Sequence, residues 1–326
     1  MTATTTVPAE LDGEQRDDRY TALVERLSRQ SVEKHFEAYV DVPWDDPDYA
    51  IDPADPRWEL PADEGGLGAT DWYRSRPQPV RARLGLHAIV GNMKAGLQFE
   101  SILKRGLLEY AFRLPDHSPE FRYAYHEVIE EAQHSLMFQE FVNRSGLDAP
   151  GLTWDLKLGA RRVLGTARRF PALFFVFVLG GEDPIDHVQR QVLRSGRDLH
   201  PLTERIMRIH VTEEARHLSF ARQYLRREVP ALGAVKRQVI AVQAPMILST
   251  MAQVMMRPPR HLVRTYDIPD DALDEAFGKG SASRQEVRHS LRKVRRLLDE
   301  LGLITPATKR LWQVTDIWED DVAPAA

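Results

Sequence analysis

Two short segments of this chain place glutamate and histidine at helical spacing. The first is EEAQH at 130–134, in which Glu131 and His134 are three residues apart, and the second is HVTEEARH at 210–217. Residues three or four apart lie on one face of a helix. The second segment therefore presents His210, Glu214 and His217 together, because they occupy positions i, i+4 and i+7.

The spacing of two further glutamates separates this pattern from chance. Glu100 precedes Glu131 by 131 − 100 = 31 residues, and Glu182 precedes Glu214 by 214 − 182 = 32 residues. A helical hairpin imposes such a spacing, because half a helix, a short turn and half a helix separate two residues at the same level.

A third Glu-x-x-His pattern, Glu286/His289, lacks this partner. The same distance before Glu286 falls at Met255, in the segment VMMRPP, where there is no carboxylate. We interpret Glu286/His289 as a chance match on a solvated basic helix.

A glutamate from each of two helices and a Glu-x-x-His pair from each of two others can hold two iron or manganese ions inside a helical bundle. The predicted fold is therefore all-α, a ferritin-like four-helix bundle core with additional helices and a long irregular N-terminal loop. We expect a disordered segment at 1–18 and one helical domain over 19–326, with its bundle core at about 79–257.

Apolar periodicity and capping residues predict the individual helices. The four bundle helices are expected at about 79–113, 118–146, 171–195 and 200–228, and the other helices at about 20–38, 154–168, 234–256 and 284–301. Pro184 cannot donate to the carbonyl of Gly180, which predicts a kink or a π-type turn beside Glu182. Trp44, Trp58 and Trp72 are expected to pin the loop at 41–78 to the bundle.

Composition limits the functional class. The chain has 326 residues, a net charge of −4 and no cysteine. This balance gives no electrostatic case for nucleic acid, and the missing thiols exclude disulfides, iron–sulfur clusters and cysteine nucleophiles. The N-terminus shows no signal peptide, and the apolar run at 172–181 is too short to span a bilayer, so we expect no membrane span and a cytoplasmic location.

The predicted ligands suit iron(II) or manganese(II), which favour mixed carboxylate and imidazole donors. Four glutamates balance the charge of two divalent ions, so the reduced site is neutral. Glu130 and Glu213 point about 100° away from the ligand face, which places them behind the ligands or at the surface. The neighbours of Glu100 are interpreted as core more than as a substrate pocket, and they are Met93, Leu97, Phe99 and Leu103.

Together, HVTEEARH, EEAQH, the lone glutamate in LQFES and the segment GGEDPID resemble the p-aminobenzoate N-oxygenase (AurF-like) family over about residues 79–230. The resemblance implies a ferritin-like fold and a di-iron site with a third histidine that ordinary bundles lack. It implies seven metal ligands, namely Glu100, Glu131, His134, Glu182, His210, Glu214 and His217. It also implies O₂-dependent oxidation of an aromatic amine through hydroxylamine to a nitro group.

We therefore expect a di-iron monooxygenase that N-oxygenates a small, aromatic amine. The cofactors would be two iron ions, with manganese possible and O₂ as co-substrate, and O₂ would bind on the catalytic face formed by Glu100 and His210. A reductase or ferredoxin would supply electrons, and analogy favours a homodimer. Two alternatives stay open: C–H hydroxylation or desaturation of a small, lipid or carrier-bound substrate, and iron handling by a ferritin-like protein. The basic helix at 284–301 is either a solvated surface or a docking site for an acidic electron carrier.

Overall fold

The computed structural model describes residues 13–319, and every regular element in this range is helical. The predicted all-α class is confirmed. Residues 1–12, which belong to the segment expected to be disordered, lie outside the described residues. Residues 13–18 of that segment are helical, because the first helix begins at Gly13.

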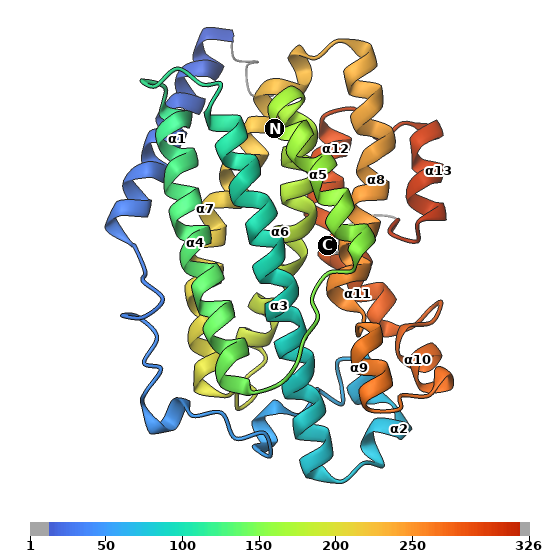
Figure 1. Cartoon of the computed structure of the whole chain (residues 1–326). Helices are drawn as coiled ribbons and strands as arrows, with labels where there is room; N and C mark the ends of the chain where they lie inside the picture. Colours follow the sequence, from blue (N-terminus) through green and yellow to red (C-terminus); the bar gives the residue numbers. More distant parts are fainter. Residues whose placement is uncertain (1–12, 320–326) are drawn as a thin grey trace, which may run out of the picture.

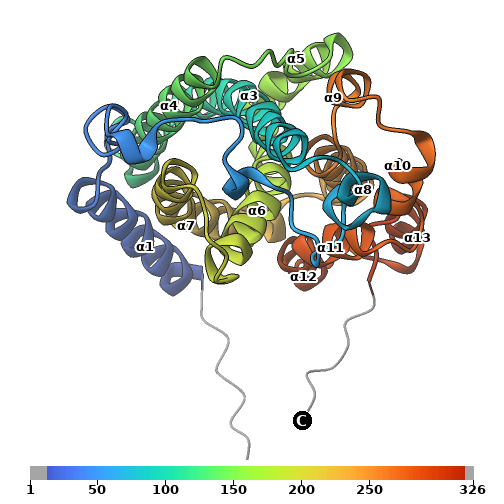
Figure 2. The ribbon, with the colours of Figure 1, turned by 90° about the horizontal axis from the view of Figure 1, so that it is seen from below.

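Four long helices form the bundle, and each begins and ends within about three residues of its predicted bounds. In the ring they form, α3 packs on α4 and α6 packs on α7, while α3–α6 and α4–α7 contacts close it. Figures 1 and 2 show their near-parallel arrangement. The helices are α3 (Gln78–Ala111), α4 (Pro119–Ser145), α6 (Pro171–Arg194) and α7 (Pro201–Ala231).

Local sequence fixes the ends of these helices. Ser118 caps α4, since its hydroxyl accepts a hydrogen bond from the amide of Phe121 at 3.2 Å, and Gly146 ends the helix in the left-handed region at φ 61°. Pro184 lies inside α6, yet the residues on both sides are α-helical and no π turn is assigned there. The expected π-type turn is therefore wrong.

The remaining helices cover the bundle from different sides. The N-terminal helix α1 (Gly13–Glu33) packs on α4 and α7, the crossover helix α5 (Trp154–Arg169) packs on α3 and α6, and α8 (Ala234–Met256) packs on α6. Helix α1 and the C-terminal helices lie on opposite sides of the bundle (Figure 2). The first helix ends five residues before its predicted end at 38, where the chain turns into the loop.

The C-terminal region consists of short helices rather than one long basic helix. The predicted helix at 284–301 is interrupted at Leu291, a fully buried residue that ends α11 and precedes α12. Its arginines are also less solvated than expected, because Arg288 pairs with Asp316 at 2.6 Å and Arg295 is buried. The helices are α9 (Arg260–Thr265), α10 (Asp270–Phe277), α11 (Ala282–Ser290), α12 (Arg292–Glu300) and α13 (Pro306–Val314).

The loop between α1 and α3 is held by aromatic side chains that pack on the core, as predicted for its three tryptophans. Trp58 is 2% exposed, and Trp44 is also buried, whereas Trp72 is partly exposed. A Cβ at Gly85 of α3 would lie 1.9 Å from the carbonyl oxygen of Trp58, so only glycine allows this close approach. The loop contains η1 (Pro47–Tyr49), η2 (Pro56–Trp58), η3 (Leu67–Ala69) and α2 (Asp71–Arg74).

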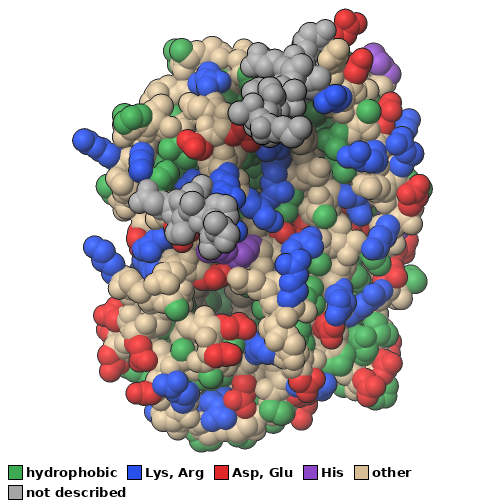
Figure 3. All heavy atoms as spheres, turned by 180° about the vertical axis from the view of Figure 1, so that it is seen from behind, with side chains coloured by type: hydrophobic (Ala, Val, Ile, Leu, Met, Phe, Trp, Pro, Cys, Tyr) green, Lys and Arg blue, Asp and Glu red, His purple; other side chains and the backbone are tan. Residues whose placement is uncertain are grey.

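One stretch of the described chain, Ala234–Thr265, is long and apolar enough to cross a membrane by composition alone, although core helices meet the same criterion. Within the fold, α8 packs on α6 and α13. On the back of the molecule, Lys and Arg side chains are interspersed with Asp and Glu (Figure 3).

Candidate metal centre

All seven residues predicted as metal ligands are buried, and they come from all four bundle helices. One comes from α3, two from α4, one from α6 and three from α7. Their donor atoms form two groups, and within each group the atoms lie within 4.8 Å of one another. The first group is Glu100, His134 and His210, and the second is Glu131, Glu182, Glu214 and His217.

Glu214 lies at the centre of the cluster. Its Oε1 atom is 3.5 Å from His210 Nε2, 3.5 Å from His217 Nδ1 and 3.7 Å from His134 Nδ1. A carboxylate that faces three imidazoles from both groups is placed to serve both. The helical spacing identified in the sequence, with its two hairpins, is what brings these side chains to one level.

The donor atoms have few hydrogen-bond partners of their own. Among the described residues, both carboxylate oxygens of Glu182 and of Glu214 are buried without a partner. The same holds for Glu131 Oε1 and His217 Nδ1, which face each other at 3.0 Å without hydrogen-bond geometry. Buried polar atoms are ordinarily satisfied, so this convergence of oxygen and nitrogen atoms fits a pair of divalent cations.

Burial controls the charge of the carboxylates. The pKa of Glu100 is raised well above its usual value by burial and by the nearby charge of Glu131, and the pKa of Glu182 is raised by burial and by Glu214. Burial also acts on Glu131, but hydrogen bonds from Glu100 and His134 and the charge of His217 outweigh it and lower its pKa. Four carboxylates this close need positive charge between them to ionise together.

The pKa values of the three histidines are also shifted in different directions. Burial would lower the pKa of His134, but hydrogen bonds to Glu131 and Glu213 outweigh it and raise the pKa to about 10. The pKa of His217 is also raised, because Glu214 and Glu131 outweigh its burial. Burial dominates at His210 and lowers its pKa to about 4, so this imidazole is neutral and ready to donate a lone pair.

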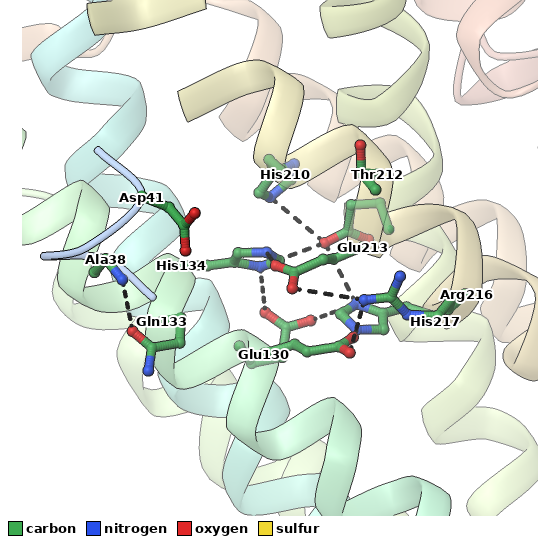
Figure 4. A network of polar contacts seen from close by, with 12 residues as sticks. Ala38, Asp41, Glu130, Gln133, His134, His210, Thr212, Glu213, Arg216 and His217 are labelled. Carbon is green, nitrogen blue, oxygen red and sulfur yellow. Dashed lines mark hydrogen bonds and ion pairs between the residues drawn. The ribbon is translucent and has the colours of Figure 1, made fainter. Parts of the chain in front are cut away.

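A second layer of carboxylates holds the imidazoles, and it crosses between the hairpins (Figure 4). Glu130 of α4 accepts a hydrogen bond from His217 Nε2 of α7 at 2.7 Å, and Glu213 of α7 accepts one from His134 Nε2 of α4 at 2.9 Å. Both glutamates are fully buried, so the surface alternative is wrong and the position behind the ligands is the observed one. Such partners fix the ring orientation and leave each Nδ1 facing the cluster.

Arg216 balances the charge of this second layer. Its Nη2 atom lies 2.7 Å from Glu130 Oε1 and 3.5 Å from Glu213 Oε1 (Figure 4). Burial alone would raise the pKa of Glu130, but the hydrogen bond from His217 and the charge of Arg216 outweigh it and lower the pKa to about 2. One buried arginine thus lies beside both supporting carboxylates and holds the pKa of Glu130 low.

His210 is oriented differently from the other two histidines. Its Nδ1 atom lies 2.9 Å from the side-chain oxygen of Gln189, on α6, while its Nε2 faces Glu100 and Glu214. Gln189 follows Glu182 by seven residues, which places both on one face of α6. Sequence reasoning did not find Gln189, although this two-turn spacing from a predicted ligand was available as a signal.

A cavity of about 640 Å³ adjoins the cluster on one side. Glu100, Glu182 and His210 line it, whereas the other four candidate ligands do not. Met93 and Phe99 line it too, and both are also buried members of the hydrophobic core, whereas Leu97 and Leu103 are not among its lining residues. The cluster therefore has one face open to a chamber and the others closed by protein.

Comparison with known proteins gives a family for this arrangement. The family model described as p-aminobenzoate N-oxygenase AurF matches residues 17–302. The chain belongs to the AurF family. It is also 40% identical over 301 residues to uncharacterized proteins of Mycobacterium tuberculosis (strain CDC 1551 / Oshkosh) and Mycobacterium bovis, covering 92% of this chain and 88% of each relative.

Membership of the AurF family supports a di-iron oxygenase, and it confirms the resemblance seen in the sequence. The family match runs well beyond the segment at 79–230 that carried the resemblance, and it includes the N-terminal loop and α8. The loop and the apolar helix are thus part of the family domain.

A buried acid beside the AurF-family site was missed by sequence reasoning. Glu127 lies one turn before Glu131 on α4, is fully buried, and neither of its oxygens has a hydrogen-bond partner in residues 13–319. Burial raises its pKa to about 8. Its position four residues before a predicted ligand, on the face of α4 expected to point into the bundle, was the signal that could have found it.

The third Glu-x-x-His pattern lies elsewhere. Glu286 accepts a hydrogen bond from His187 Nε2 at 2.8 Å, and the ring of His289 is 5.2 Å from that of His187. Neither Glu286 nor His289 belongs to the two metal-competent groups of the described chain. The pair joins α11 to α6 instead.

Proposed function

We propose that this protein is a di-iron N-oxygenase that uses O₂ to oxidise an amine, aromatic as the family name indicates, toward hydroxylamine and nitro products. The observation that carries the proposal is the convergence of seven buried donors in two groups, with a chamber on one side. The AurF family match supports the oxygenase class, and it is the reason for choosing nitrogen as the atom that is oxidised.

In this proposal the four glutamates and three histidines hold two iron ions, with manganese as the alternative metal. Their formal charge of −4 equals the charge of two iron(II) ions, so the reduced site is neutral in a buried setting. The metal pair, when bound, supplies the activation of O₂. We assign Glu100 and His210 to the catalytic face of the site, since they line the chamber in which a substrate would lie.

The protein's own residues position and protect this site. Glu130 and Glu213 aim two imidazoles, Gln189 aims the third, and the buried helices exclude water from all faces but one. The conversion of an amine to a hydroxylamine by O₂ consumes two electrons and two protons and releases water. We therefore include an external reductase or ferredoxin as electron donor, and propose a homodimer in the cytoplasm with a single domain over 19–326.

The proposal is tested by metal analysis together with turnover. Purified wild-type protein is expected to hold about two irons per chain and to convert an arylamine when reduced in the presence of O₂. Glu214→Ala and His134→Ala are expected to lose both iron and activity, because each removes a donor. Unchanged iron content in both variants would falsify the ligand assignment.

A second candidate function is C–H hydroxylation or desaturation, and the apolar lining of the chamber favours it. Phe99, Phe177 and Ile185 surround the approach to the cluster. A panel of amines and matched hydrocarbons separates the two reactions: turnover of amines without any C–H product rejects the second. Ferritin-like iron handling is distinguished by the same assay, since it predicts iron oxidation that no organic substrate changes.

A further inference from the structure

The chamber is much larger than a single aromatic ring requires. An engineered protein cavity of about 150 Å³ accommodates benzene, whereas this chamber has a volume of about 640 Å³. It lies within the range of pockets that bury ligands of drug size. A one-ring amine would occupy roughly a quarter of it, and water would fill the rest.

The chamber is also long. On α3 its lining runs from Ile89 to Ile102, which is 102 − 89 = 13 residues, or about 20 Å at the helical rise of about 1.5 Å per residue. On α6 it runs from Phe177 to Val192, a similar length. The candidate ligands Glu100 and Glu182 lie nearer one end of these stretches, so an elongated molecule whose end lies beside the metals has most of its room toward Ile89 and Val192.

The lining is apolar and adaptable. Five methionines line the chamber, and methionine fills irregular apolar space more readily than branched side chains do; they are Met93, Met207, Met246, Met251 and Met255. Two of the lining arginines are already engaged, since Arg57 is hydrogen-bonded to Asp55 and Arg197 donates to the carbonyl of Glu59 at 3.1 Å. The third, Arg162 of α5, is exposed to solvent. The chamber thus favours an apolar body over an anionic one.

Both α5 and α8 flank α6, and each contributes exposed residues to the lining, Asp155 and Arg162 on α5 and Met246 and Thr250 on α8, so we place the opening between these two helices. Met246 is 51% exposed and Thr250 is exposed on α8, and both also line the chamber. On the α5 side the lining includes Gly159, where an added Cβ would have nothing within 4 Å. A ligand can therefore enter from this side without displacing the bundle helices.

Resting on the proposed N-oxygenation, we infer that the substrate is an amine attached to a long, uncharged, apolar body, which enters between α5 and α8 and extends along α3 and α6 away from the metals. This departs from the small amine expected from the sequence. The amine is the end that reaches Glu100 and His210, and the apolar body fills the methionine-lined remainder.

The test uses iron-loaded, full-length protein and a fluorescent arylamine, N-phenyl-1-naphthylamine, whose emission rises in apolar surroundings. Two competitors share the aniline ring: 4-octylaniline carries an apolar chain and 4-aminobenzoate carries a carboxylate. Because each buried methylene adds to affinity, 4-octylaniline is expected to displace the probe at a concentration about 100-fold lower. Equal displacement by the two competitors overturns the proposal.

Two glycines on α5 supply a matched pair of variants. Gly159→Leu places a side chain in the chamber, and Gly165→Leu adds the same side chain to the same helix at a position with open space that does not line the chamber. We expect probe affinity to fall about tenfold or more in the first and to be unchanged in the second. Wild-type affinity in Gly159→Leu contradicts the inferred binding path.

A second pair of variants, on α8, tests the same entry route, so that the result does not depend on whether a substitution in α5 disturbs folding. Thr250→Trp narrows the opening from the exposed side of α8, and Gln243→Trp is its control, since Gln243 is exposed on the same helix and does not line the chamber. Thr250→Trp is expected to slow probe entry or weaken binding, and no change in either contradicts the entry route. If 4-octylaniline binds tightly but is not N-oxygenated, the proposed reaction fails while the inferred ligand class stands.

Discussion

At the scale of single residues, the site depends on two carboxylates that are not themselves predicted metal ligands. Glu213 and Glu130 each accept a hydrogen bond from a histidine on the other hairpin, and Arg216 lies between them. Outer partners of this kind keep an imidazole in one tautomer and strengthen it as a ligand. Their removal is expected to affect the metal before it affects the fold.

We predict that Glu213→Gln weakens iron binding about 10- to 100-fold, as measured by competition with a chelator. The amide oxygen can still accept from His134, so the variant removes the charge and retains the shape. The control is Glu204→Gln on the same helix, which breaks only a surface pair with Arg208 and should leave iron affinity unchanged. Equal affinities for Glu213→Gln and wild type would show that the carboxylate does not support the metal.

The buried side chain of Glu127 leads to a prediction of how folding stability depends on pH. Burial raises its pKa from 4.5 in the unfolded chain to about 8 in the fold. The unfolded state therefore releases this proton at lower pH, and stability falls as pH rises from 4.5 through about 8. In metal-free protein, Glu127→Gln removes this loss and should gain on the order of 4 kcal/mol over wild type at high pH, with little gain near pH 4.5.

Chemical denaturation of metal-free wild type and Glu127→Gln at several pH values measures this difference. Glu109→Gln, a change at an exposed glutamate on α3, is the control and should follow the wild-type pH dependence. A stability difference between Glu127→Gln and wild type that does not change with pH would contradict the prediction.

The candidate ligands could be predicted from sequence, whereas the residues that support them could be predicted only in part and their hydrogen-bond partners not at all, for a physical reason. Ligands on one helix repeat at three or four residues, and ligands on paired helices repeat at the hairpin length, so Glu100, Glu131, Glu182 and Glu214 were visible as a pattern. Gln189, Glu213 and Arg216 find their partners across helices, through packing that no spacing along the chain encodes.

At the scale of elements, one close contact between α3 and α6 depends on Gly181. A Cβ at Gly181 would lie 1.9 Å from Cζ of Phe99, whose ring is packed against Phe177 with centroids 5.3 Å apart. Gly181 directly precedes Glu182, so the ring and the candidate ligand depend on the same turn of α6. This close approach explains the glycine at 181, and at Gly180 an added Cβ would lie 3.0 Å from Cδ2 of Leu248 on α8.

We predict that Gly181→Ala destabilises the protein by about 1–3 kcal/mol, since overpacking forces Phe99 to move, and that it lowers iron content by shifting Glu182. Gly165→Ala is the matched control, because a Cβ there has nothing within 4 Å, and alanine is the better helix former. Thermal unfolding and iron analysis measure both effects, and a Gly181→Ala variant as stable as the control would contradict the packing argument.

Helix boundaries were less predictable than helix existence. The bundle helices have capping residues such as Ser118 and Gly146, which mark their ends in the sequence. The break at Leu291 between α11 and α12 has no such mark, because neither Gly nor Pro occurs there and the turn follows from burial of the leucine. Tertiary packing therefore decided this boundary.

At the scale of the whole molecule, metal and fold stabilise each other. Ions that bind the folded chain and not the unfolded chain add stability in proportion to the logarithm of their concentration relative to the dissociation constant. The buried carboxylates also repel one another without a cation. We predict that removal of iron lowers the midpoint of thermal unfolding by on the order of 10 °C.

Calorimetry of iron-loaded, chelator-treated and reloaded samples measures this shift. Readdition of iron(II) or manganese(II) should restore the midpoint, whereas magnesium, which prefers oxygen ligands, should restore little of it. The His134→Ala variant is the control, because it should start low and respond weakly to added iron. The same midpoint with and without iron in wild-type protein would show that no ion is bound at the cluster.

The crossed pairs of Glu130 with His217 and Glu213 with His134 have a consequence for biogenesis. Neither hairpin alone can present a finished set of donors, because each relies on the other to aim its imidazole. Uptake of iron thus reports that both halves have docked correctly. A copy that has misassembled captures no ion and stays inert, which spares the cell an exposed, oxygen-reactive metal.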